Sequence, residues 1–425
     1  MSKLSVRGCV MSSVVALAWC GGTIGYADGY RNPVPGGVGL GRGGVVAAQI
    51  EDPSAISYNP ANLVFINKPS FMAAATVARS ETKYTSPLGQ EATTKDPWIV
   101  LPNVYGVWPT TSGKGVWGLG ITTPYGQSTE WDKDSVFRYS APYYAAMQLV
   151  NVNPTYAFRL TDSLSLGLGL DIYASSIEMK QMYPWAMVTQ NPMTPDGALR
   201  AEGDGIGWGG NVGVTWKMTS KQRLALTYRS RSTIKYEGDF HVGGLPDRSQ
   251  LPPPLWGLTS SSDFSSTMEF PDILGAGYGI AVTDKLNVEF DVEWLNWSRN
   301  HHQHMNLDNN NLLMPSTTTQ NDWNDTWTYG VSAEWLCAPD WVLRAGYIFI
   351  PTPVPEQNLT AYLPDTDHQV VSLGVGYHKN GHAVDLAYTV NFYRDRDISD
   401  NQNPALNGKY ETSSDLFGIS YTKSF

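Results

Sequence analysis

The sequence predicts an all-β fold: a 14-stranded antiparallel transmembrane β-barrel with an N-terminal hatch plugging the lumen. Apolar and polar residues alternate with a period of two from about residue 70 to the last residue. Short polar turns and long polar loops alternate along the same stretch. The chain is also rich in aromatic residues (12%) and holds 41 glycines. These features are typical of strands that face lipid on one side and pack tightly on the other.

Residues 1–27 have the features of a secretory signal peptide. Lys3 and Arg7 supply a positive start, residues 10–19 are apolar, and Gly-Tyr-Ala at 25–27 forms a small-residue cleavage site. We expect the mature chain to begin near Asp28. A lipoprotein signal ending at the cysteine of position 20 is the alternative, and the bulky tryptophan before it disfavours that reading.

Charge and cysteine content exclude several protein classes. Removing Lys3 and Arg7 takes the formal net charge from −10 to −12, which argues against a nucleic-acid partner because phosphate binding needs a basic surface. Cys337 is the one cysteine of the expected mature chain, so no internal disulfide can form. No run of about 20 apolar residues follows the signal, which excludes a helical inner-membrane protein.

The alternation is clearest in three segments, residues 164–173, 286–294 and 384–392. In each, apolar residues take every second position, and small, polar or acidic residues take the others. The acidic residues of 286–294 predict a lumen that is wet rather than a dry core. An immunoglobulin-like sandwich, the alternative all-β fold, would turn its apolar face inward and needs no such density of aromatic residues.

The turns and loops between the segments predict the number of strands. Short turns occur around residues 112–114, 161–163, 219–221, 283–285, 338–340 and 379–381, and long polar stretches occupy about 183–204, 238–263, 303–325, 351–367 and 397–411. Short periplasmic turns and long extracellular loops are the pattern of outer-membrane barrels. We therefore expect 14 strands near residues 70–86, 98–110, 115–129, 143–160, 164–182, 203–218, 222–238, 264–282, 285–303, 326–337, 341–351, 368–378, 382–397 and 410–425.

The C-terminal strand carries a further signal, because it alternates up to the terminal Phe425. Such an ending resembles the mark by which the outer-membrane assembly machinery recognises barrels. We expect that machinery as a partner, beside outer-membrane lipid and lipopolysaccharide, in a Gram-negative bacterium. Because an open strand edge in hydrocarbon leaves backbone groups unpaired, the barrel must close on itself, and a monomer suffices.

Residues 28–69 predict a plug inside the barrel. They show too little alternation for a membrane strand and too much Gly, Ala and Pro for an independent domain. A 14-stranded barrel would leak solutes if it were open. The glycine run at 36–44 can turn tightly against the wall. A phosphate-binding loop is the alternative for this run, and it fails because no strand precedes it and no Lys-Ser/Thr follows.

Several motifs resemble the FadL family of outer-membrane transporters. Gly-Leu-Gly-Arg-Gly-Gly at 39–44 and the triplet Asn59-Pro60-Ala61 are similar to the family's hatch. Further similar segments lie at 203–211, 226–230, 293–298, 353–355 and 363–365, so that the resemblance covers essentially the whole mature chain. It implies a hatch-plugged barrel for passive uptake of long-chain fatty acids or, in related members, aromatic hydrocarbons.

The resemblance also suggests which residues meet the substrate. Apolar loop residues Trp256 and Leu258, with Leu312 and Leu313, are expected to form a capture groove, and plain loop packing is the alternative. The family's ligand carboxylate meets lumenal basic and hydroxyl groups, whose counterparts here are Thr123, Lys180 and His304. Since histidine is a weaker cation than lysine or arginine, an uncharged aromatic ligand is the alternative.

The resemblance further implies a kink in the third strand, next to the Asn-Pro-Ala triplet. Here Pro124 and Gly126 occupy the corresponding stretch, where Pro124 cannot donate a ladder hydrogen bond. The expected role is a lateral gate that lets substrate leave into the membrane. A plain bulge is the alternative.

Three other function classes compete with transport of hydrophobic molecules. His301, His302 and His304 could bind a metal, but a solvated loop is favoured and we expect neither metal nor cofactor. No nucleophile motif stands in a recognisable setting, so we do not expect an enzyme. A general porin remains the third class, and the hatch-like N-terminus counts against it.

Overall fold

The structure is a computed structural model that describes residues 28–95, 98–308 and 317–425. The expected signal peptide therefore lies outside the described residues. The strands are β1 (Ser70–Thr85), β2 (Glu91–Thr93), β3 (Trp98–Pro109), β4 (Gly115–Thr122), β5 (Gly126–Glu130), β6 (Tyr144–Arg159), β7 (Leu164–Tyr183), β8 (Gly197–Lys217), β9 (Gln222–Arg229), β10 (Ser232–Gly243), β11 (Ser261–Phe270), β12 (Ile273–Thr283), β13 (Leu286–Leu295), β14 (His302–Leu307), β15 (Thr317–Gln320), β16 (Thr326–Ala338), β17 (Trp341–Ile350), β18 (His368–Lys379), β19 (His382–Tyr393), β20 (Arg396–Ile398) and β21 (Gly408–Ser424).

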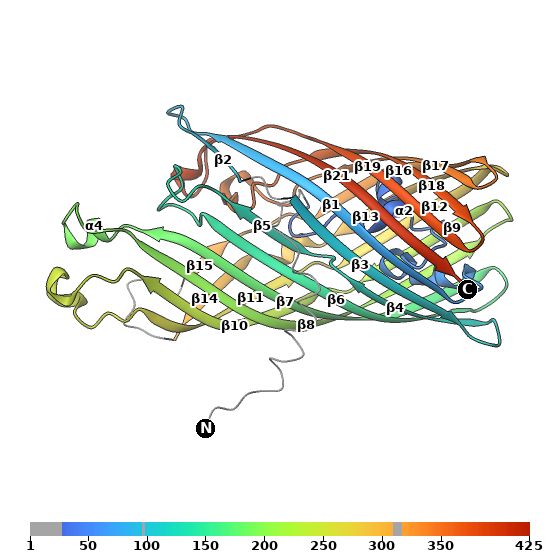
Figure 1. The fold of residues 1–425 in the computed structure, drawn as a ribbon, viewed down its shortest axis with the longest axis horizontal. Coiled ribbons are helices and arrows are strands. Elements are labelled where there is room, and N and C mark those ends of the chain that lie inside the picture. The colour runs from blue at the N-terminus through green and yellow to red at the C-terminus, as the bar shows by residue number, and fades with distance from the viewer. Residues whose placement is uncertain (1–27, 96–97, 309–316) are drawn as a thin grey trace, which may run out of the picture.

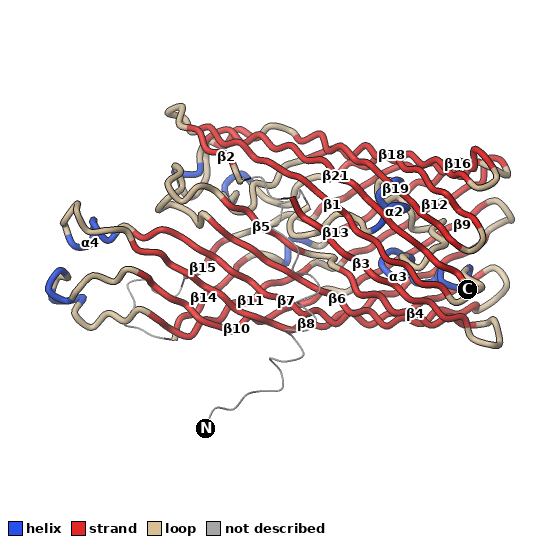
Figure 2. The backbone as a smooth tube through the Cα atoms, viewed as in Figure 1, coloured by secondary structure: helices blue, strands red, loops and turns tan. Residues whose placement is uncertain are grey.

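These elements form a closed antiparallel barrel (Figure 1). Several wall strands consist of two elements in line, for example β4 with β5 and β13 with β14, so the described elements make 14 wall strands. β1 closes the barrel on β21 over its whole length, from Ser70 opposite Ser424 to Thr85 opposite Lys409. The predicted strand number is confirmed, and so is the order of short and long connections. Figure 2 shows strands along nearly the whole wall, with helical segments confined to the interior and the loops.

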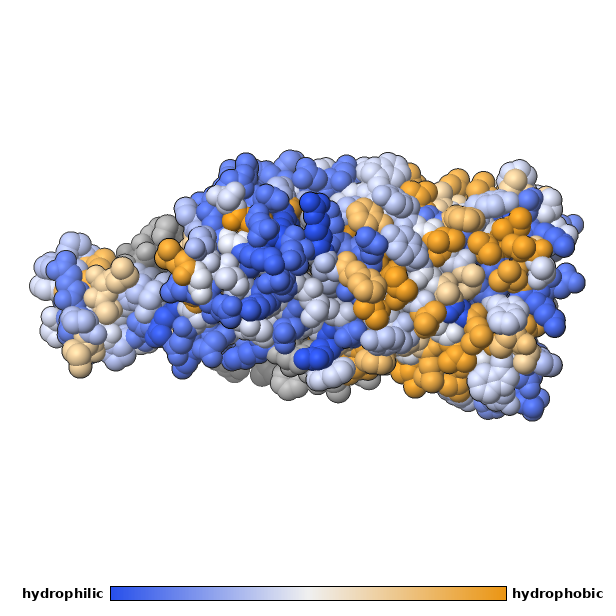
Figure 3. Space-filling model, turned by 90° about the horizontal axis from the view of Figure 1, so that it is seen from above, coloured by the Kyte–Doolittle hydropathy of each residue, from blue (hydrophilic) through white to orange (hydrophobic). Residues whose placement is uncertain are grey.

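On the face seen in Figure 3, apolar side chains gather over one half of the barrel, whereas the other half is mainly hydrophilic. Tryptophans mark both borders of this apolar belt: Trp208 and Trp216 on β8, and Trp327 and Trp335 on β16, are all exposed. The two tryptophans of each pair are eight residues apart, which is about 26 Å along a strand. This separation fits two aromatic girdles that border the hydrocarbon core of the membrane. β7 and β8 are twice as long as a membrane crossing requires. The barrel wall therefore continues well outside the membrane.

Helices contribute little to the wall. In the part of the chain that the structure describes, no helix has the length and apolar character to cross a bilayer. The helical segments of the described residues are α2 (Gly36–Gly41), α3 (Ala55–Tyr58), α4 (Trp185–Thr189), η2 (Pro60–Phe65), η3 (Arg248–Gln250), η4 (Pro253–Leu255), η5 (Trp297–Arg299), η6 (Glu356–Asn358) and η7 (Pro404–Leu406). α2, α3 and η2 fill the lumen near the short-turn end (Figures 1 and 2).

The hatch of residues 28–69 packs inside the barrel, and β1 begins directly after it at Ser70. Two interior glycines of the wall make room for the Asn-Pro-Ala turn. A Cβ on Gly213 of β8 would lie 2.0 Å from Asn59 Oδ1, and a Cβ on Gly167 of β7 would lie 2.3 Å from the carbonyl carbon of Pro60. Asn59 is fully buried there, and its Nδ2 donates to Ala47 O (2.7 Å) and Thr215 Oγ1 (2.8 Å).

The acidic residues of β13 face the lumen, where they bind the hatch. Glu289, fully buried, forms an ion pair of 2.7 Å with Arg42 and accepts the backbone N–H of Ala48. Asp291 accepts the N–H of Ala47 at 2.9 Å. Glu293 pairs with Arg31 at 2.7 Å. The alternation on this strand thus reflects a polar hatch that needs charged partners, since buried polar groups must be paired.

Some strand limits differ from the prediction. Residues 264–282 and 285–303 were expected as single strands, but the ladder breaks at residues 271–272 and 296–301. The expected loops at 183–204 and 303–325 contain strand: β8 begins at Gly197, and β14 and β15 pair outside the membrane belt. Polar residues there are compatible with strands because both faces of this extension meet water or packed loops.

Candidate functional site

The third wall strand is broken where the sequence predicts a kink. β4 pairs with β6 up to Thr122 opposite Asn151, and β5 resumes with Gly126 opposite Gln148. Residues 123–125 therefore face only two residues of β6, which leaves one extra residue on the third strand. Such an insertion bends a strand and ends its regular pairing.

The break leaves a gap in the strand pairing of the barrel wall. β3 pairs with β4 only from Val104 to Pro109, and β5 pairs only with β6. Among the residues that the structure describes, Trp98 to Asn103 have a ladder partner on the β1 side alone. Asn103 closes the lower corner of the gap, because its Oδ1 accepts the N–H of Thr123 at 3.2 Å. Above this corner β3 and β5 share no ladder, and a backbone hydrogen bond from Lys95 N to Glu130 O at 2.8 Å crosses the break at the end of β5.

The start of the hatch covers this break from inside. Asn32 N donates to Pro124 O, and Gly126 N donates to Tyr30 O, both at 2.9 Å. Asn32 Nδ2 also donates to Thr123 O at 2.9 Å. Pro124 and Gly126 are thus placed at the break as predicted. The expected neighbour is wrong, however, because the Asn-Pro-Ala turn is seated on β7 and β8, and Tyr30–Asn32 is the segment bonded to the break.

A cavity of about 240 Å³ lies in the extracellular part of the lumen. Its apolar lining includes four methionines, Met147, Met179, Met268 and Met305. Gln127 of β5 and Tyr30 of the hatch also line it, so the cavity borders the broken strand and the segment that covers the break. Methionine side chains are flexible and polarisable, which suits ligands of varied shape. Glu178 is the one charged residue among the described residues that line this cavity.

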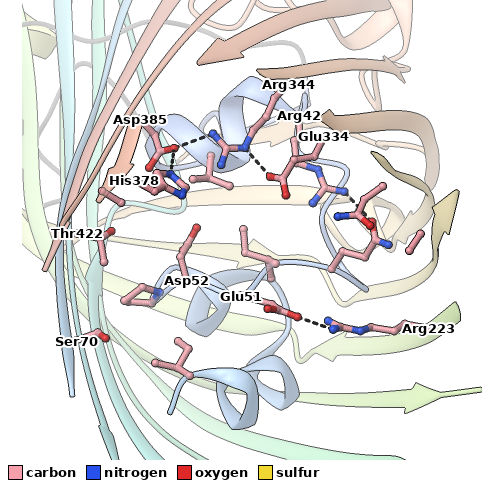
Figure 4. Close-up of a pocket in the computed structure, with 18 of the residues that line it drawn as sticks. Arg42, Glu51, Asp52, Ser70, Arg223, Glu334, Arg344, His378, Asp385 and Thr422 are labelled. Atoms are coloured by element: carbon pink, nitrogen blue, oxygen red, sulfur yellow. Dashed lines mark hydrogen bonds and ion pairs between the residues drawn. The ribbon is translucent and has the colours of Figure 1, made fainter. Parts of the chain in front are cut away.

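A second cavity, of about 390 Å³, lies below the hatch at the short-turn end and is polar. Figure 4 shows ion pairs between several of its charged side chains. Arg344 binds Asp385 and Glu334, each at 2.7 Å, and Glu51 of the hatch pairs with Arg223 at 2.5 Å. His378 lies 2.8 Å from Asp385. An apolar molecule would find no favourable surface in this lower cavity.

Two predicted ligand residues do not lie in the lumen. Lys180 is not among the residues that line the cavity, and it occupies an even-numbered position of β7, like the exposed Leu168 and Leu170; of the β7 residues that line the cavity, Ile177, Met179 and Gln181 are odd-numbered and Glu178 is even-numbered. Its ammonium pairs with Glu178 at 3.1 Å and lies over the ring of Tyr144. The prediction that it points inward is wrong.

His304 lies between Gln303 and Met305 on β14, and both of these residues line the cavity. Because neighbouring residues of a strand point to opposite faces, His304 points away from the cavity. It is exposed, and its Nδ1 lies 2.8 Å from Thr318 Oγ1. The prediction of an inward His304 is therefore wrong as well. Within the described ranges, no group of His, Cys, Asp and Glu side chains has the arrangement of a metal site.

The remaining predicted residues lie elsewhere. Thr123 is at the break, and its Oγ1 is buried without a hydrogen-bond partner among the described residues. Trp256 is half exposed below the guanidinium of Arg248, and Leu258 packs against the core of the extracellular lobe, so both fit the loop-packing alternative as well as a groove. Leu312 and Leu313 lie outside the described residues.

Sequence reasoning missed the methionine lining and the Arg42–Glu289 pair. The methionines lie at odd-numbered positions of β6, β7 and β14 and at an even-numbered position of β11. The alternation of each strand shows which positions face the lumen, so these residues could have been predicted from the sequence. Nothing in the sequence pairs Arg42 with a residue 247 positions away. That contact depends on the closed barrel.

Comparisons with known proteins agree with this geometry. Residues 32–425 match the family model described as outer membrane protein transport protein (OMPP1/FadL/TodX). The long-chain fatty acid transport protein of Escherichia coli strain K12 is 27% identical, over 91% of this chain and 92% of that protein. A putative outer membrane protein of Neisseria meningitidis is 26% identical, over 94% and 95%.

Solved structures show the same fold. A Pseudomonas aeruginosa FadL homologue superposes with a TM-score of 0.80 at 21% identity, covering 93% of this chain and 99% of that one. The Pseudomonas putida toluene transporter TodX gives 0.71 at 18%, covering 92% and 98%. The family match spans nearly all of the expected mature chain, and this chain therefore belongs to the FadL/TodX family of outer-membrane transport proteins.

Proposed function

We propose that this protein takes up hydrophobic molecules by capturing them in the methionine-lined cavity and releasing them sideways through the gap between β3 and β5. The observation that carries the proposal is the position of the cavity, which borders both the broken strand and the hatch residue Tyr30 that covers the break. Movement of Tyr30–Asn32 alone would join the cavity to the gap. The rest of the hatch can stay in place.

A straight path to the periplasm is disfavoured by the lower hatch. It is tied to the wall by the buried Arg42–Glu289 pair and by the fit of Asn59–Ala61 onto Gly167 and Gly213. The cavity beneath it is lined by paired charges. An apolar molecule gains about 0.8 kcal/mol for each methylene that leaves water, and a lateral exit keeps that gain because the molecule passes directly into lipid.

Long-chain fatty acids are the first substrate class, since curated relatives that span most of this chain carry that name. A carboxylate in the cavity would have to be met by neutral donors, such as Gln127, Gln303 and Thr319. The lack of a lining cation in the described residues favours uncharged aromatic hydrocarbons as the second class. The solved toluene transporters share this fold.

Met268→Asp is expected to weaken binding of both oleate and toluene at least about tenfold, because it places an unpaired carboxylate in an apolar cavity. Met268 is buried and lines the cavity. Binding is measured by calorimetry with the detergent-solubilised protein. Met187→Asp is the control and should leave both affinities unchanged, since Met187 is exposed and does not line the cavity. Binding of neither ligand, or equal binding by the Met268→Asp variant, would contradict the cavity assignment.

Deleting Pro124 is expected to abolish uptake while binding persists. The deletion removes the extra residue, so that two residues face Leu149 and Val150 and the strand can continue beside β3. Uptake of labelled oleate and toluene is measured in cells that lack other transporters of this family. Pro124→Ala is the matched control: it keeps the extra residue and should keep uptake. Normal uptake by the deletion variant would rule out the lateral route.

The protein's remaining partners follow from its position in the membrane. The aromatic girdles and the hydrophilic outer extension support contact with outer-membrane lipid and lipopolysaccharide. The exposed Phe425 at the end of β21 is available to the barrel assembly machinery. The closed wall supports a monomer as the working unit.

A further inference from the structure

A second lumenal cavity lies between the hatch and the wall on the side of β16–β19 and β21. Its volume is about 90 Å³. Among the described residues, it shares no lining residue with the methionine-lined cavity. Uptake through the methionine-lined cavity makes no use of this space. Aliphatic side chains form much of its lining: Val34 and Leu40 of the hatch, and Ile350, Val370 and Leu416 of the wall.

Two buried polar groups of the wall line this cavity and have no hydrogen-bond partner among the described residues. They are Nδ1 of His368, which is 3% exposed, and Oδ1 of Asn391, which is 6% exposed. The His368 ring stacks on Tyr393, with ring centroids 4.9 Å apart. Asn391 Nδ2 donates to Ser414 Oγ at 2.7 Å, which holds the amide in place. A buried polar atom without a partner is costly, so the two groups indicate a ligand that completes them.

The strand register brings the two groups within reach of one ligand atom. Asn391 of β19 lies opposite Val370 of β18, and His368 precedes Val370 by two residues. His368 and Asn391 are therefore diagonal neighbours, whose Cβ atoms lie about 7 Å apart. An oxygen with two hydrogen bonds joins groups up to about 6 Å apart. A hydroxyl group fits both, because it donates to the amide oxygen and accepts from the imidazole tautomer that is protonated on Nδ1.

The charged part of the lining disfavours acidic ligands. Asp28 and Glu293 line the cavity beside Arg31, whose guanidinium binds Glu293 at 2.7 Å and Asp28 at 3.5 Å. A ligand carboxylate would meet an excess of negative charge there. An ammonium group would have to leave water for a largely aliphatic lining, which favours an uncharged ligand. The ligand is also small, since a volume of about 90 Å³ is less than the roughly 150 Å³ of a cavity that binds benzene.

We propose that this space, the His368–Asn391 cavity, is a second binding site, for small uncharged molecules that carry a hydroxyl group. The hydroxyl oxygen bridges Asn391 Oδ1 and His368 Nδ1, and the short hydrocarbon part lies against Val370 and Leu416. The methionine-lined cavity selects by apolar surface, whereas this one selects by hydrogen bonding and size. The two sites are independent, so the second stands or falls without reference to the first.

Bromine makes a small ligand visible in a crystal through its anomalous scattering. Crystals of the protein purified from outer membranes are soaked in bromoethanol or in propyl bromide, which has the same number of non-hydrogen atoms and lacks the hydroxyl. Bromoethanol should occupy the His368–Asn391 cavity, with its oxygen within hydrogen-bond distance of both polar groups. Propyl bromide should need about tenfold more ligand for equal occupancy, because both groups stay unpaired.

Two variants of neighbouring residues test the site itself. Val370→Phe fills the cavity from the wall and should abolish the bromoethanol peak. Val371→Phe is the matched control, since Val371 is 42% exposed on the outer face and the peak should remain. If Val370→Phe fails to fold, Asn391→Leu removes the acceptor at similar volume and should lower the affinity for bromoethanol about tenfold. Ordered water alone in the cavity, equal occupancy by the two bromides, or an unchanged peak in the folded site variant would overturn the proposal.

Discussion

Replacing Gly167 by valine is expected to unseat the Asn59–Ala61 turn and to turn a closed barrel into an ion-conducting one. A Cβ at this position would lie 2.3 Å from the carbonyl carbon of Pro60 and 2.4 Å from the nitrogen of Ala61. Both are backbone atoms, which cannot rotate away as a side chain does. Overpacking of this kind costs about 1–3 kcal/mol or more, and moving the turn out of contact is the simplest relief.

The measurement is single-channel conductance in planar lipid bilayers, supported by leakage of small hydrophilic dyes into cells. Wild type should stay closed, and the Gly167→Val variant should show long-lived openings. Gly243→Ala is the control, since its Cβ would meet its nearest neighbour at an ordinary 3.5 Å. A silent Gly167→Val barrel would mean that the plug does not depend on the contact of this turn with β7.

Arg42→Ala is expected to destabilise the folded protein by about 3–5 kcal/mol, because it leaves the carboxylate of Glu289 buried without its cation. Both side chains are almost fully buried and lie 2.7 Å apart. Arg42 Nε also donates to Ser332 Oγ at 3.0 Å. The loss is measured as a lower midpoint of thermal unfolding, read from the heat-dependent shift of the barrel on denaturing gels.

A double variant separates the buried charge from simple loss of contact. In Arg42→Met with Glu289→Gln, the cavity is filled, no charge is left unpaired, and the side-chain carbonyl of the introduced glutamine can still accept the N–H of Ala48. This variant should recover most of the lost stability, since a buried ion pair can often be exchanged for neutral groups of similar volume. If it is as unstable as Arg42→Ala, the ion pair itself rather than the buried charge holds the hatch.

The alternation of odd and even positions along each strand predicts which side chains face lipid and which face the lumen. It also shows where that prediction fails. The leucines at 164–170 identify the lipid face of β7, and the same even parity puts Lys180 outside. The sequence therefore contains the signal against an inward Lys180, whereas the family resemblance points the other way. For β14, the ladder breaks at residues 296–301 before His304, so the parity of β13 does not carry over to it.

The sequence by itself determined the closed barrel, the number of its strands and the hatch, and the family resemblance located the break in the third strand. These features depend on local alternation, on turn residues such as those at 161–163, and on Pro124, all of which act over a few residues. Only the tertiary structure decided that Tyr30–Asn32 covers the break, that Asn59 rests on Gly213, and that four methionines meet in one cavity. Closure of the barrel brings together residues hundreds of positions apart, and local patterns cannot specify which polar groups then become each other's partners.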